Sequence, residues 1–235
     1  MMHIHFIQHE LFEAPGAFLI WAKRKELRIT FSKVFDNEPL PDSIDKIDIL
    51  IVLGGPQNPN TTLEECPHFN ANNEISFIKK CIENDKAVIG VCLGSQLISH
   101  ALNSQFAHSP EKEIGVFPIQ LTKEGLQDEK LKHFSPSLLV GHWHSDMPGL
   151  TPDCKILATS EGCPRQIVSY SDKVYGFQCH LELTLEAVKL LVDHDKDISS
   201  NTQHRFIQNP DDIVNYDYTE MNNNLYLFLD KFITG

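Results

Sequence analysis

A cysteine near the middle of the chain has the sequence context of a catalytic nucleophile. Cys92 lies at the centre of Gly90–Gly94, which follows the aliphatic run Ala87–Ile89 and opens a segment with helical spacing. At a sharp turn from a strand into a helix, only small residues two positions before and after the nucleophile avoid a clash. The helix N-terminus at such a turn favours a thiolate. A buried structural cysteine on an ordinary turn is the alternative interpretation.

A histidine and a glutamate farther along the chain could activate such a thiol. His180 and Glu182 follow the predicted strand Val174–Gln178. If the chain stays extended there, residues two apart point to the same face, so that the carboxylate can orient the imidazole and stabilise its charged form. On a helix the two side chains would diverge, and the interpretation therefore depends on an extended segment.

A third segment could stabilise the oxyanion of an acyl-transfer reaction. The strand-like run Ile51–Leu53 ends in Gly54, Gly55 and Pro56. A turn of this composition exposes a backbone N–H group with no side chain in the way. A tight turn without a chemical role is the alternative interpretation.

Metal-binding patterns are sparse in the sequence. His142 and His144 alternate along a predicted strand and could bind a metal, but the six cysteines contain no CxxC pair. In a cytoplasmic chain these cysteines are expected to be reduced thiols. These patterns predict no metal site.

The reactive groups must be positioned by a framework in which short apolar runs alternate with helical stretches. We expect strands at residues 3–7, 29–34, 47–53 and 87–91, and helices at residues 15–27, 74–84 and 93–102. Strands and helices that alternate in this way are typical of a parallel sheet with helices on both faces. The predicted fold class is therefore α/β, with a mostly parallel central sheet flanked by helices.

The second half of the chain predicts shorter strands, interpreted as antiparallel additions to the same sheet. They are expected at residues 116–121, 138–143, 155–159, 166–170 and 174–178, separated by turn residues. An amphipathic helix should follow residue 183 and run through Leu191. A last helix at residues 225–233 should pack back on the body.

The chain is predicted to form one domain with an appendage. Residues 1–193 make up the domain, and residues 194–235 make up a helical C-terminal extension packed on it. The stretch 193–224 is polar and weakly patterned, with polar runs at residues 199–201 and 222–224. This composition predicts a solvated helical cap.

Taken in order, the three motifs resemble those of class I glutamine amidotransferases. After the Gly-Gly-Pro turn, the chain reads G-x-C-x-G-x-Q from Gly90 to Gln96 and F-Q-x-H-x-E from Phe177 to Glu182. The resemblance covers about residues 4–191 and points to the stand-alone branch that is similar to the amidotransferase domain of GMP synthase. It implies the flavodoxin-like fold of that family.

The resemblance implies a role for each matched residue. Cys92 would be the nucleophile, His180 the base and then the acid, and Glu182 the carboxylate that orients the imidazole. The backbone N–H groups of Gly55 and Leu93 would form the oxyanion hole. Three further residues of these motifs would contact the substrate: Gly54, Pro56 and Gln96.

A further match places another segment at the substrate pocket. His142–Asp146 corresponds to the family's S-H-x-D segment. By this match Trp143, Ser145 and Asp146 would lie near the α-amino and carboxylate groups of glutamine. Glu113–Gly115 resembles the family's E-I-G segment and would brace the same cleft.

Two residues depart from the family pattern. Leu181 stands between the histidine and the glutamate where many relatives have proline. Gln57 follows the Gly-Gly-Pro turn where close stand-alone relatives often have methionine. Neither change removes a reactive group, so both bear on pocket shape and specificity rather than on the triad.

The resemblance implies hydrolysis of the glutamine γ-amide through a γ-glutamyl thioester, which yields glutamate and ammonia. This chemistry requires no metal and no organic cofactor, and we expect neither. A γ-glutamyl peptidase or hydrolase that acts on another γ-glutamyl compound is one alternative. A non-catalytic binding or regulatory protein is another. Cysteine proteases and chaperones of the related parallel-sheet class fit less well, because they usually place the histidine close behind the cysteine, where this chain has Leu93.

The destination of the ammonia stays open at this point. Fused members of the family pass it to a synthetase domain, and this chain is too short to hold one and has no P-loop motif. Either a separate synthetase subunit docks on the protein, or the chain works alone on its small-molecule substrate.

Charge and composition exclude other classes of function. The 235 residues, with 41% hydrophobic and 22% charged residues, describe an ordinary globular protein. The formal net charge of −12 argues against binding to nucleic acid or to anionic membranes. No apolar run approaches the ~20 residues that span a bilayer. The N-terminus lacks the pattern of a signal peptide, so we expect a cytoplasmic location.

Overall fold

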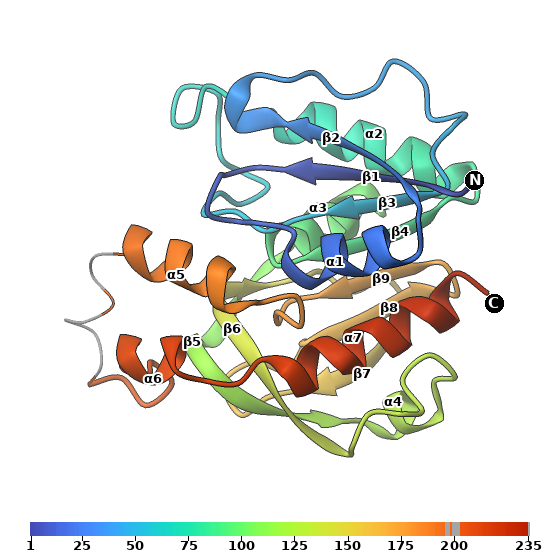
Figure 1. The fold of residues 1–235 in the computed structure, drawn as a ribbon. Coiled ribbons are helices and arrows are strands. Elements are labelled where there is room, and N and C mark those ends of the chain that lie inside the picture. The colour runs from blue at the N-terminus through green and yellow to red at the C-terminus, as the bar shows by residue number, and fades with distance from the viewer. Residues whose placement is uncertain (196–197, 199–202, 235) are drawn as a thin grey trace.

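The computed structural model describes residues 1–195, 198 and 203–234 and shows one sheet flanked by helices (Figure 1). Within those residues, nine strands pair in the order β2-β1-β3-β4-β9-β8-β7-β5-β6. The strands are β1 (His3–Gln8), β2 (Arg28–Lys33), β3 (Ile49–Val52), β4 (Ala87–Val91), β5 (Ala107–Leu121), β6 (Ser137–Met147), β7 (Lys155–Thr159), β8 (Ile167–Ser171) and β9 (Val174–Phe177). The pairings from β2 to β9 are parallel, and those from β9 to β6 are antiparallel. The predicted α/β fold with antiparallel additions is confirmed.

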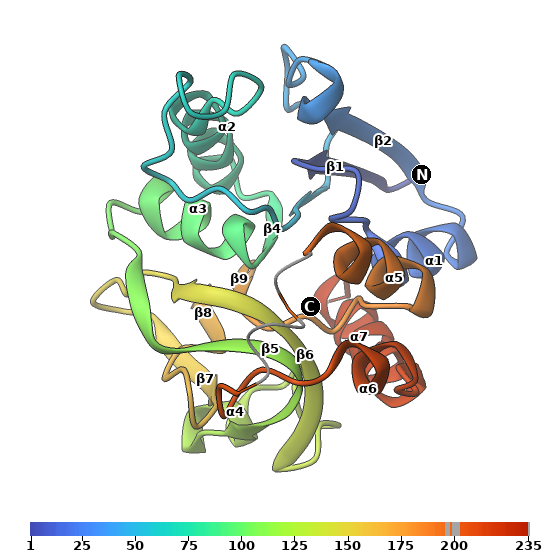
Figure 2. The ribbon, with the colours of Figure 1, turned by 90° about the vertical axis from the view of Figure 1, so that its left-hand side faces the viewer.

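Helices cover both faces of the sheet (Figures 1 and 2). α1 (Gly16–Arg24) and α7 (Thr219–Phe232) pack on one face, and α2 (Ala71–Glu83) and α3 (Leu93–Ala101) pack on the other. A third apolar cluster joins α5 (Leu185–His194) and α6 (Pro210–Val214) to β5. Further helical elements among the described residues are α4 (Lys123–Gln127) and a 3₁₀ turn at Val34–Asp36. The described helices include none with the length and apolar character that a bilayer crossing requires.

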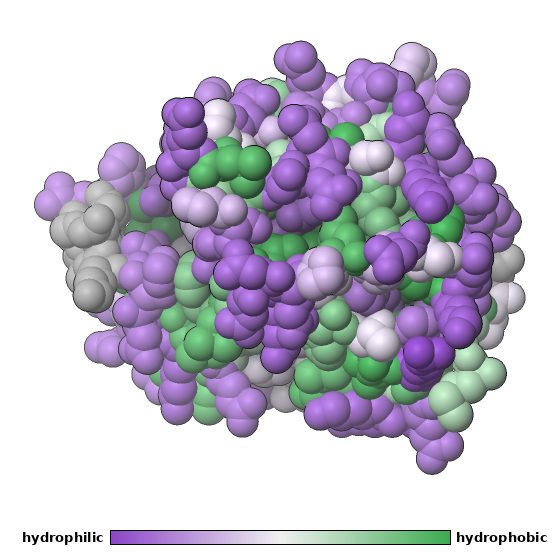
Figure 3. Space-filling model, turned by 90° about the horizontal axis from the view of Figure 1, so that it is seen from above, coloured by the Kyte–Doolittle hydropathy of each residue, from purple (hydrophilic) through white to green (hydrophobic). Residues whose placement is uncertain are grey.

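The alternation of side chains in β3 shows how the sheet is covered on both sides. Ile49 and Ile51 belong to the apolar cluster beneath α1 and α7, while Leu50 and Val52 belong to the cluster beneath α2 and α3. Successive residues of a strand point to opposite faces, so a strand covered on both sides is apolar throughout. This explains why an unbroken aliphatic run predicted the strand. The molecular face in Figure 3, by contrast, is mainly hydrophilic with small apolar areas.

β5 and β6 extend farther than the sequence predicted. They form a long, curved antiparallel pair (Figure 2), whose register shifts between His108 and Glu113. The predicted strands at residues 116–121 and 138–143 cover only part of this pair. Residues 108–112 are polar and mostly exposed, so no apolar alternation marks them as a strand.

The last helix also begins earlier than predicted. α7 starts at Thr219 rather than at residue 225, and the three asparagines at residues 222–224 lie within it. Asn222 donates hydrogen bonds from Nδ2 to the carbonyls of Leu181 and Leu183, at 2.8 and 2.9 Å. These bonds explain a polar side chain on the inner face of the helix, in a stretch whose polar composition predicted a solvated cap.

α7 contributes to the main core. Phe228 is fully buried, and its ring centroid lies 5.2 Å from that of Tyr175 and 5.1 Å from that of Phe177. This part of the tail is therefore a core helix, in agreement with the expectation that the last helix packs back on the body. The predicted polar run at residues 199–201 lies outside the described residues, and the boundary at residue 193 stays a prediction.

Candidate active site

Cys92 occupies a strained turn between β4 and α3. Its backbone angles are φ 51° and ψ −110°, a combination that residues with a side chain rarely adopt. A Cβ atom on Gly90 would lie 2.3 Å from the Gly94 oxygen, and one on Gly94 would lie 2.0 Å from the Val52 oxygen. Both neighbours must therefore be glycine, which is the geometry that the spacing around Cys92 predicts.

His180 and Glu182 form a buried hydrogen-bonded pair. The distance between His180 Nδ1 and Glu182 Oε1 is 2.6 Å, and both residues are less than 5% exposed. The segment is extended, because His180 exchanges two backbone hydrogen bonds with Gly141, at 2.8 and 2.9 Å. The two side chains thus face each other as the extended interpretation requires.

Neighbouring charges favour the protonated form of His180. Burial alone lowers the pKa of the imidazole, but the Glu182 carboxylate and the Cys92 thiol outweigh burial and raise that pKa well above its usual value. His180 Nε2 has no hydrogen-bond partner in the described part of the chain. Because Nδ1 faces Glu182, Nε2 is the nitrogen that remains to exchange a proton with a thiol or a substrate.

The Gly-Gly-Pro turn after β3 packs against the cysteine turn. A Cβ atom on Gly54 would lie 3.5 Å from the Cβ of Cys92, and one on Gly55 would lie 2.8 Å from a methyl carbon of Leu93. The structure thus brings together the two segments whose backbone N–H groups are predicted to form an oxyanion hole. Their role toward an oxyanion stays a prediction.

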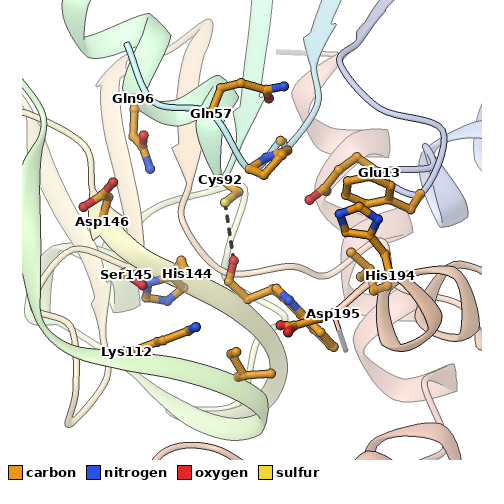
Figure 4. A pocket seen from close by; sticks show the side chains of 16 residues that line it. Glu13, Gln57, Cys92, Gln96, Lys112, His144, Ser145, Asp146, His194 and Asp195 are labelled. Carbon is orange, nitrogen blue, oxygen red and sulfur yellow. Dashed lines mark hydrogen bonds between the residues drawn. The ribbon is translucent and has the colours of Figure 1, made fainter. Parts of the chain in front are cut away.

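Cys92 lines a cavity of about 430 Å³ (Figure 4). Seven residues of the predicted site line it: Gly55, Pro56, Cys92, Gln96, Trp143, Ser145 and Asp146. The other four predicted residues are buried and do not appear in its lining: Gly54, Leu93, His180 and Glu182. The sequence motifs therefore converge on one place in the fold.

Some side chains predicted to contact the substrate already have protein partners. Gln96 Nε2 donates to Gln178 Oε1 at 3.3 Å, and Asp146 Oδ1 lies 2.6 Å from His108 Nδ1. The backbone carbonyl of Trp143 accepts a hydrogen bond from the Cys92 thiol at 3.7 Å. Trp143 therefore contacts the nucleophile through its backbone.

Glu13 lies in the cavity wall and was missed by the sequence analysis. Figure 4 shows its carboxylate pointing into the cavity from the loop between β1 and α1. A Cβ atom on Gly54 would lie 2.4 Å from Glu13 Oε2, so that glycine leaves room for the carboxylate. Burial raises the pKa of Glu13; the His180 imidazole opposes this effect and the Glu182 carboxylate adds to it.

Only the position of Glu13 in the predicted topology could have indicated that it lies at the site. Ligands of α/β folds bind beyond the carboxyl ends of the parallel strands, and the loop after β1 lies at that edge. Ile114, from the segment expected to brace the cleft, also lines the cavity, and the lining residues that the motifs did not indicate include Phe12, Lys112, Leu191, His194 and Asp195. His144 and Gln57 also line the cavity. Most of these come from segments far from Cys92 in the sequence.

A buried ion pair between His9 and Glu74 contacts the backbone of the Gly-Gly-Pro turn. His9 Nε2 lies 2.7 Å from Glu74 Oε2, and its Nδ1 lies 2.9 Å from the Gly54 carbonyl oxygen. Burial opposes a charge on His9, yet the Glu74 carboxylate raises its pKa above the usual value. A protonated imidazole can donate to both partners, which fixes the position of the turn.

The described residues contain two groups with the side chains of a metal site. One is the half-buried set of Glu10, Cys66 and His68, and the other is the buried set of Glu113, His144 and Cys163. Burial is the main cause that lowers the pKa of His144. The second group lies directly behind the cavity wall.

Comparisons with known proteins identify relatives that carry the glutamine amidotransferase name. The profile of the family described as glutamine amidotransferase class-I matches residues 21–206. YfeJ, a glutamine amidotransferase-like protein of Salmonella typhimurium, is 48% identical over 231 residues, which make up 98% of this chain and 97% of that protein. A subunit of the glutamine-hydrolysing GMP synthase of Pyrococcus abyssi is 28% identical over 154 residues, or 65% of this chain and 72% of that one.

Solved structures agree over nearly the whole chain. The crystal structure of SMU.1228c matches with a TM-score of 0.98 at 46% identity, and covers 99% of this chain and 100% of its own. A glutamine amidotransferase from Thermotoga maritima matches in fold with a TM-score of 0.87 at 20% identity, over 100% and 99% of the two chains. The chain therefore belongs to the class-I glutamine amidotransferase family.

Proposed function

We propose that this protein is a cysteine-nucleophile glutaminase that hydrolyses the γ-amide of glutamine to glutamate and ammonia. The observation that carries the proposal is the buried His180–Glu182 pair behind the strained turn of Cys92, which lines a cavity. Membership of the family supports the same chemistry. The triad, the substrate and the reaction are parts of one proposal.

The first step is attack of the Cys92 thiolate on the γ-carbonyl carbon of glutamine. The raised pKa of His180 keeps a positive charge next to the sulfur, which stabilises the thiolate. The backbone N–H groups of Gly55 and Leu93 donate to the oxyanion of the tetrahedral intermediate. The amino acid part of the substrate contacts the other predicted residues of the site: Gly54, Pro56, Gln96, Trp143, Ser145 and Asp146.

The intermediate then collapses and breaks the carbon–nitrogen bond. His180 gives its Nε2 proton to the leaving nitrogen, ammonia departs, and a γ-glutamyl thioester remains on Cys92. Water next attacks the thioester carbonyl, and its proton passes to His180. Collapse of this second intermediate releases glutamate and regenerates the thiolate. Glu182 stays ionised and holds the imidazole throughout.

Glutamate release from glutamine by the whole chain tests this proposal. We expect turnover that Cys92→Ala reduces by several orders of magnitude. Glu182→Gln should lower kcat/KM by roughly a hundredfold or more and move the alkaline limb of the pH profile to lower pH, because the pKa of His180 falls without the carboxylate. Absence of turnover, together with a Cys92 thiol that a glutamine-analogue electrophile does not trap, would contradict the proposal and leave the regulatory alternative.

A second candidate is a γ-glutamyl hydrolase or peptidase with the same triad. The charged lining of the cavity favours it, because Glu13, Lys112 and Asp195 could bind a substituent on the γ-amide nitrogen. Turnover of γ-glutamyl peptides by a chain that is trapped by the electrophile but does not consume glutamine would select this candidate. Faster turnover of glutamine than of any such peptide would exclude it.

We also propose that the ammonia passes to a separate synthetase subunit in the cytoplasm. Relatives include a subunit of GMP synthase and component 2 of anthranilate synthase, which are named as parts of larger enzymes. All six cysteines are free thiols, which suits a reducing compartment. Co-purification of the tagged chain from its own cells with an ATP-dependent ligase would support this part, and recovery of the chain alone with full glutaminase activity would count against it.

A further inference from the structure

A second group of polar side chains lies buried outside the proposed triad. Glu113 comes from β5, His142 and His144 come from β6, and Gln166 directly precedes β8. Each of the four is exposed by 5% or less. His144 also forms part of the cavity wall, so this group adjoins the catalytic cavity from behind.

Three of these residues place one atom each at the corners of a nearly equilateral triangle. Glu113 Oε2 lies 3.6 Å from His142 Nδ1 and 3.3 Å from His144 Nε2, and the two nitrogens are 3.4 Å apart. Nitrogen and oxygen ligands bound to tetrahedral zinc at about 2.0–2.1 Å are about 3.4 Å from one another. The triangle therefore matches one face of a zinc coordination tetrahedron.

Gln166 supplies an atom at the fourth corner. Its Nε2 lies 2.7 Å from Glu113 Oε2 and 3.2 Å from each of the two imidazole nitrogens. With Ser160 Oγ at 2.9 Å, four polar atoms surround an amide nitrogen that has only two hydrogens. Gln166 Oε1 is buried without a partner among the described residues. A half-turn about the Cγ–Cδ bond exchanges the two atoms and brings the oxygen to the fourth corner.

Outer contacts orient two of these groups, His142 and Glu113, in the way that metal ligands require, while His144 Nδ1 has no partner among the described residues. His142 Nε2 faces the Phe117 carbonyl at 3.2 Å and therefore carries the proton, which leaves a lone pair on Nδ1. Ser160 Oγ lies 2.8 Å from both carboxylate oxygens of Glu113. Histidine and carboxylate ligands of metals usually have such second contacts, which fix the tautomer and the orientation of each ligand.

We propose that Glu113, His142, His144 and Gln166 bind a divalent cation of the zinc type. Imidazole nitrogens, a carboxylate and an amide oxygen in a tetrahedral arrangement suit zinc better than calcium or magnesium, which prefer more oxygen ligands. The ion neutralises a carboxylate that is buried away from water. The sequence raised His142 and His144 as possible metal ligands but predicted no metal, and the family match assigns no site of this kind.

The site has a structural consequence for the catalytic cavity. The ion joins the directly paired strands β5 and β6 to the segment before β8, which reaches them in the sheet only through β7. Trp143 lies between the two histidines, and its carbonyl contacts the Cys92 thiol. Metal binding therefore fixes the segment of the cavity wall that touches the nucleophile. Cys163 is a further ligand within reach, because its sulfur lies within 4.8 Å of atoms of Glu113 and His144.

Metal uptake by the whole chain tests the proposal independently of activity. Protein stripped with a chelator and dialysed against Zn²⁺ is expected to retain a single ion per chain by elemental analysis. Substituted Co²⁺ is expected to give the visible absorption of tetrahedral coordination. His142→Asn and His144→Gln should each weaken zinc affinity by roughly a hundredfold or more. His133→Gln, at a half-buried histidine outside the group, should leave the affinity unchanged.

Two further variants distinguish this site from other possible metal ligands, namely the group of Glu10, Cys66 and His68, and Cys163. The double variant Cys66→Ser with His68→Gln removes the half-buried group near Glu10 and should keep full zinc uptake. Cys163→Ser should also keep uptake if the four proposed residues suffice. Zinc uptake that survives His142→Asn but is lost with Cys66 and His68 would overturn the proposal.

Gln166→Glu keeps the proposal testable even if the histidine variants fold poorly. The new carboxylate would repel Glu113 without a cation and would be a stronger ligand with one. We expect this variant to have a lower Tm than wild type in chelator and to recover it when Zn²⁺ is added. If zinc leaves its Tm unchanged and the wild-type chain retains no metal, the group is a hydrogen-bond network only, and the proposal is wrong.

Discussion

The groups around Cys92 show how buried ionisable side chains influence one another at the scale of single residues. The Glu182 carboxylate raises the pKa of His180, and the same carboxylate contributes to the raised pKa of Glu13. An ionised Glu182 therefore supports a protonated imidazole on one side and disfavours a second carboxylate on the other. Both pKa shifts therefore share one cause, the carboxylate that orients the imidazole.

Glu13→Gln is expected to raise the Tm near neutral pH. A carboxyl group whose folded pKa is raised stabilises the fold below its unfolded pKa of about 4.3, and this contribution is lost as the pH rises through the folded pKa. Glutamine does not ionise, so the gain should be present above the folded pKa of Glu13 and vanish in acid. Thermal unfolding across this pH range measures it. Glu64→Gln, at an exposed glutamate, is the control, and equal Tm values for wild type and Glu13→Gln at neutral pH would contradict the expectation.

At the scale of elements, two helices from opposite ends of the chain fix the segment that carries Glu182. The backbone N–H of Ala17, at the start of α1, donates to the Glu182 carbonyl at 2.8 Å. Gly16 has φ +46°, and a Cβ atom there would lie 2.0 Å from that carbonyl oxygen. From α7, Asn222 binds the carbonyls on both sides of Glu182. The His180–Glu182 geometry thus depends on helix packing as well as on its own hydrogen bond.

Asn222→Ala is expected to lower the free energy of unfolding by about 1–3 kcal/mol, because it leaves the carbonyls of Leu181 and Leu183 without their donor. It should also reduce kcat, since the segment carrying Glu182 becomes less firmly held. Denaturant unfolding and glutaminase assays measure the two effects. Asn223→Ala changes an exposed neighbour on the same helix and should alter neither quantity. Equal stability of the two variants would show that α7 does not hold the segment.

Whether a feature of the structure could be predicted from the sequence depends on whether that feature is local. The glycines around Cys92 report a local steric requirement, and the aliphatic alternation of β3 reports burial on both faces, so both were predictable. Glu13 and the His9–Glu74 pair depend on residues from distant segments, and the two partners of that pair are 65 positions apart. Asn222 was predicted in a solvated cap rather than in a packed helix, because its polar side chain binds carbonyls that only the tertiary fold brings to it. Pairings of this kind leave no periodic pattern in the sequence.

At the scale of the whole molecule, the two ends of the chain meet in one core. Figure 1 shows α7 beside α1, and Trp21 Nε1 donates to Asp230 Oδ1 at 2.7 Å between them. The family profile ends at residue 206, yet the core that surrounds β4 and β9 includes Leu225, Phe228 and Phe232. A class-I domain that ended near residue 193 would therefore expose apolar surface of its own sheet.

Deletion of residues 219–235 is accordingly expected to abolish cooperative unfolding. Loss of a buried phenylalanine costs about 3–5 kcal/mol, and domains of this size have a total stability of about 5–15 kcal/mol. The stability lost on removing Leu225, Phe228 and Phe232 together therefore exceeds the total free energy of unfolding of the remaining fold. Thermal melting and binding of a hydrophobic dye measure the outcome, with deletion of residues 234–235 alone as the control. A cooperative transition in the shorter chain would show that residues 1–218 fold by themselves, and that α7 is an appendage to a finished core.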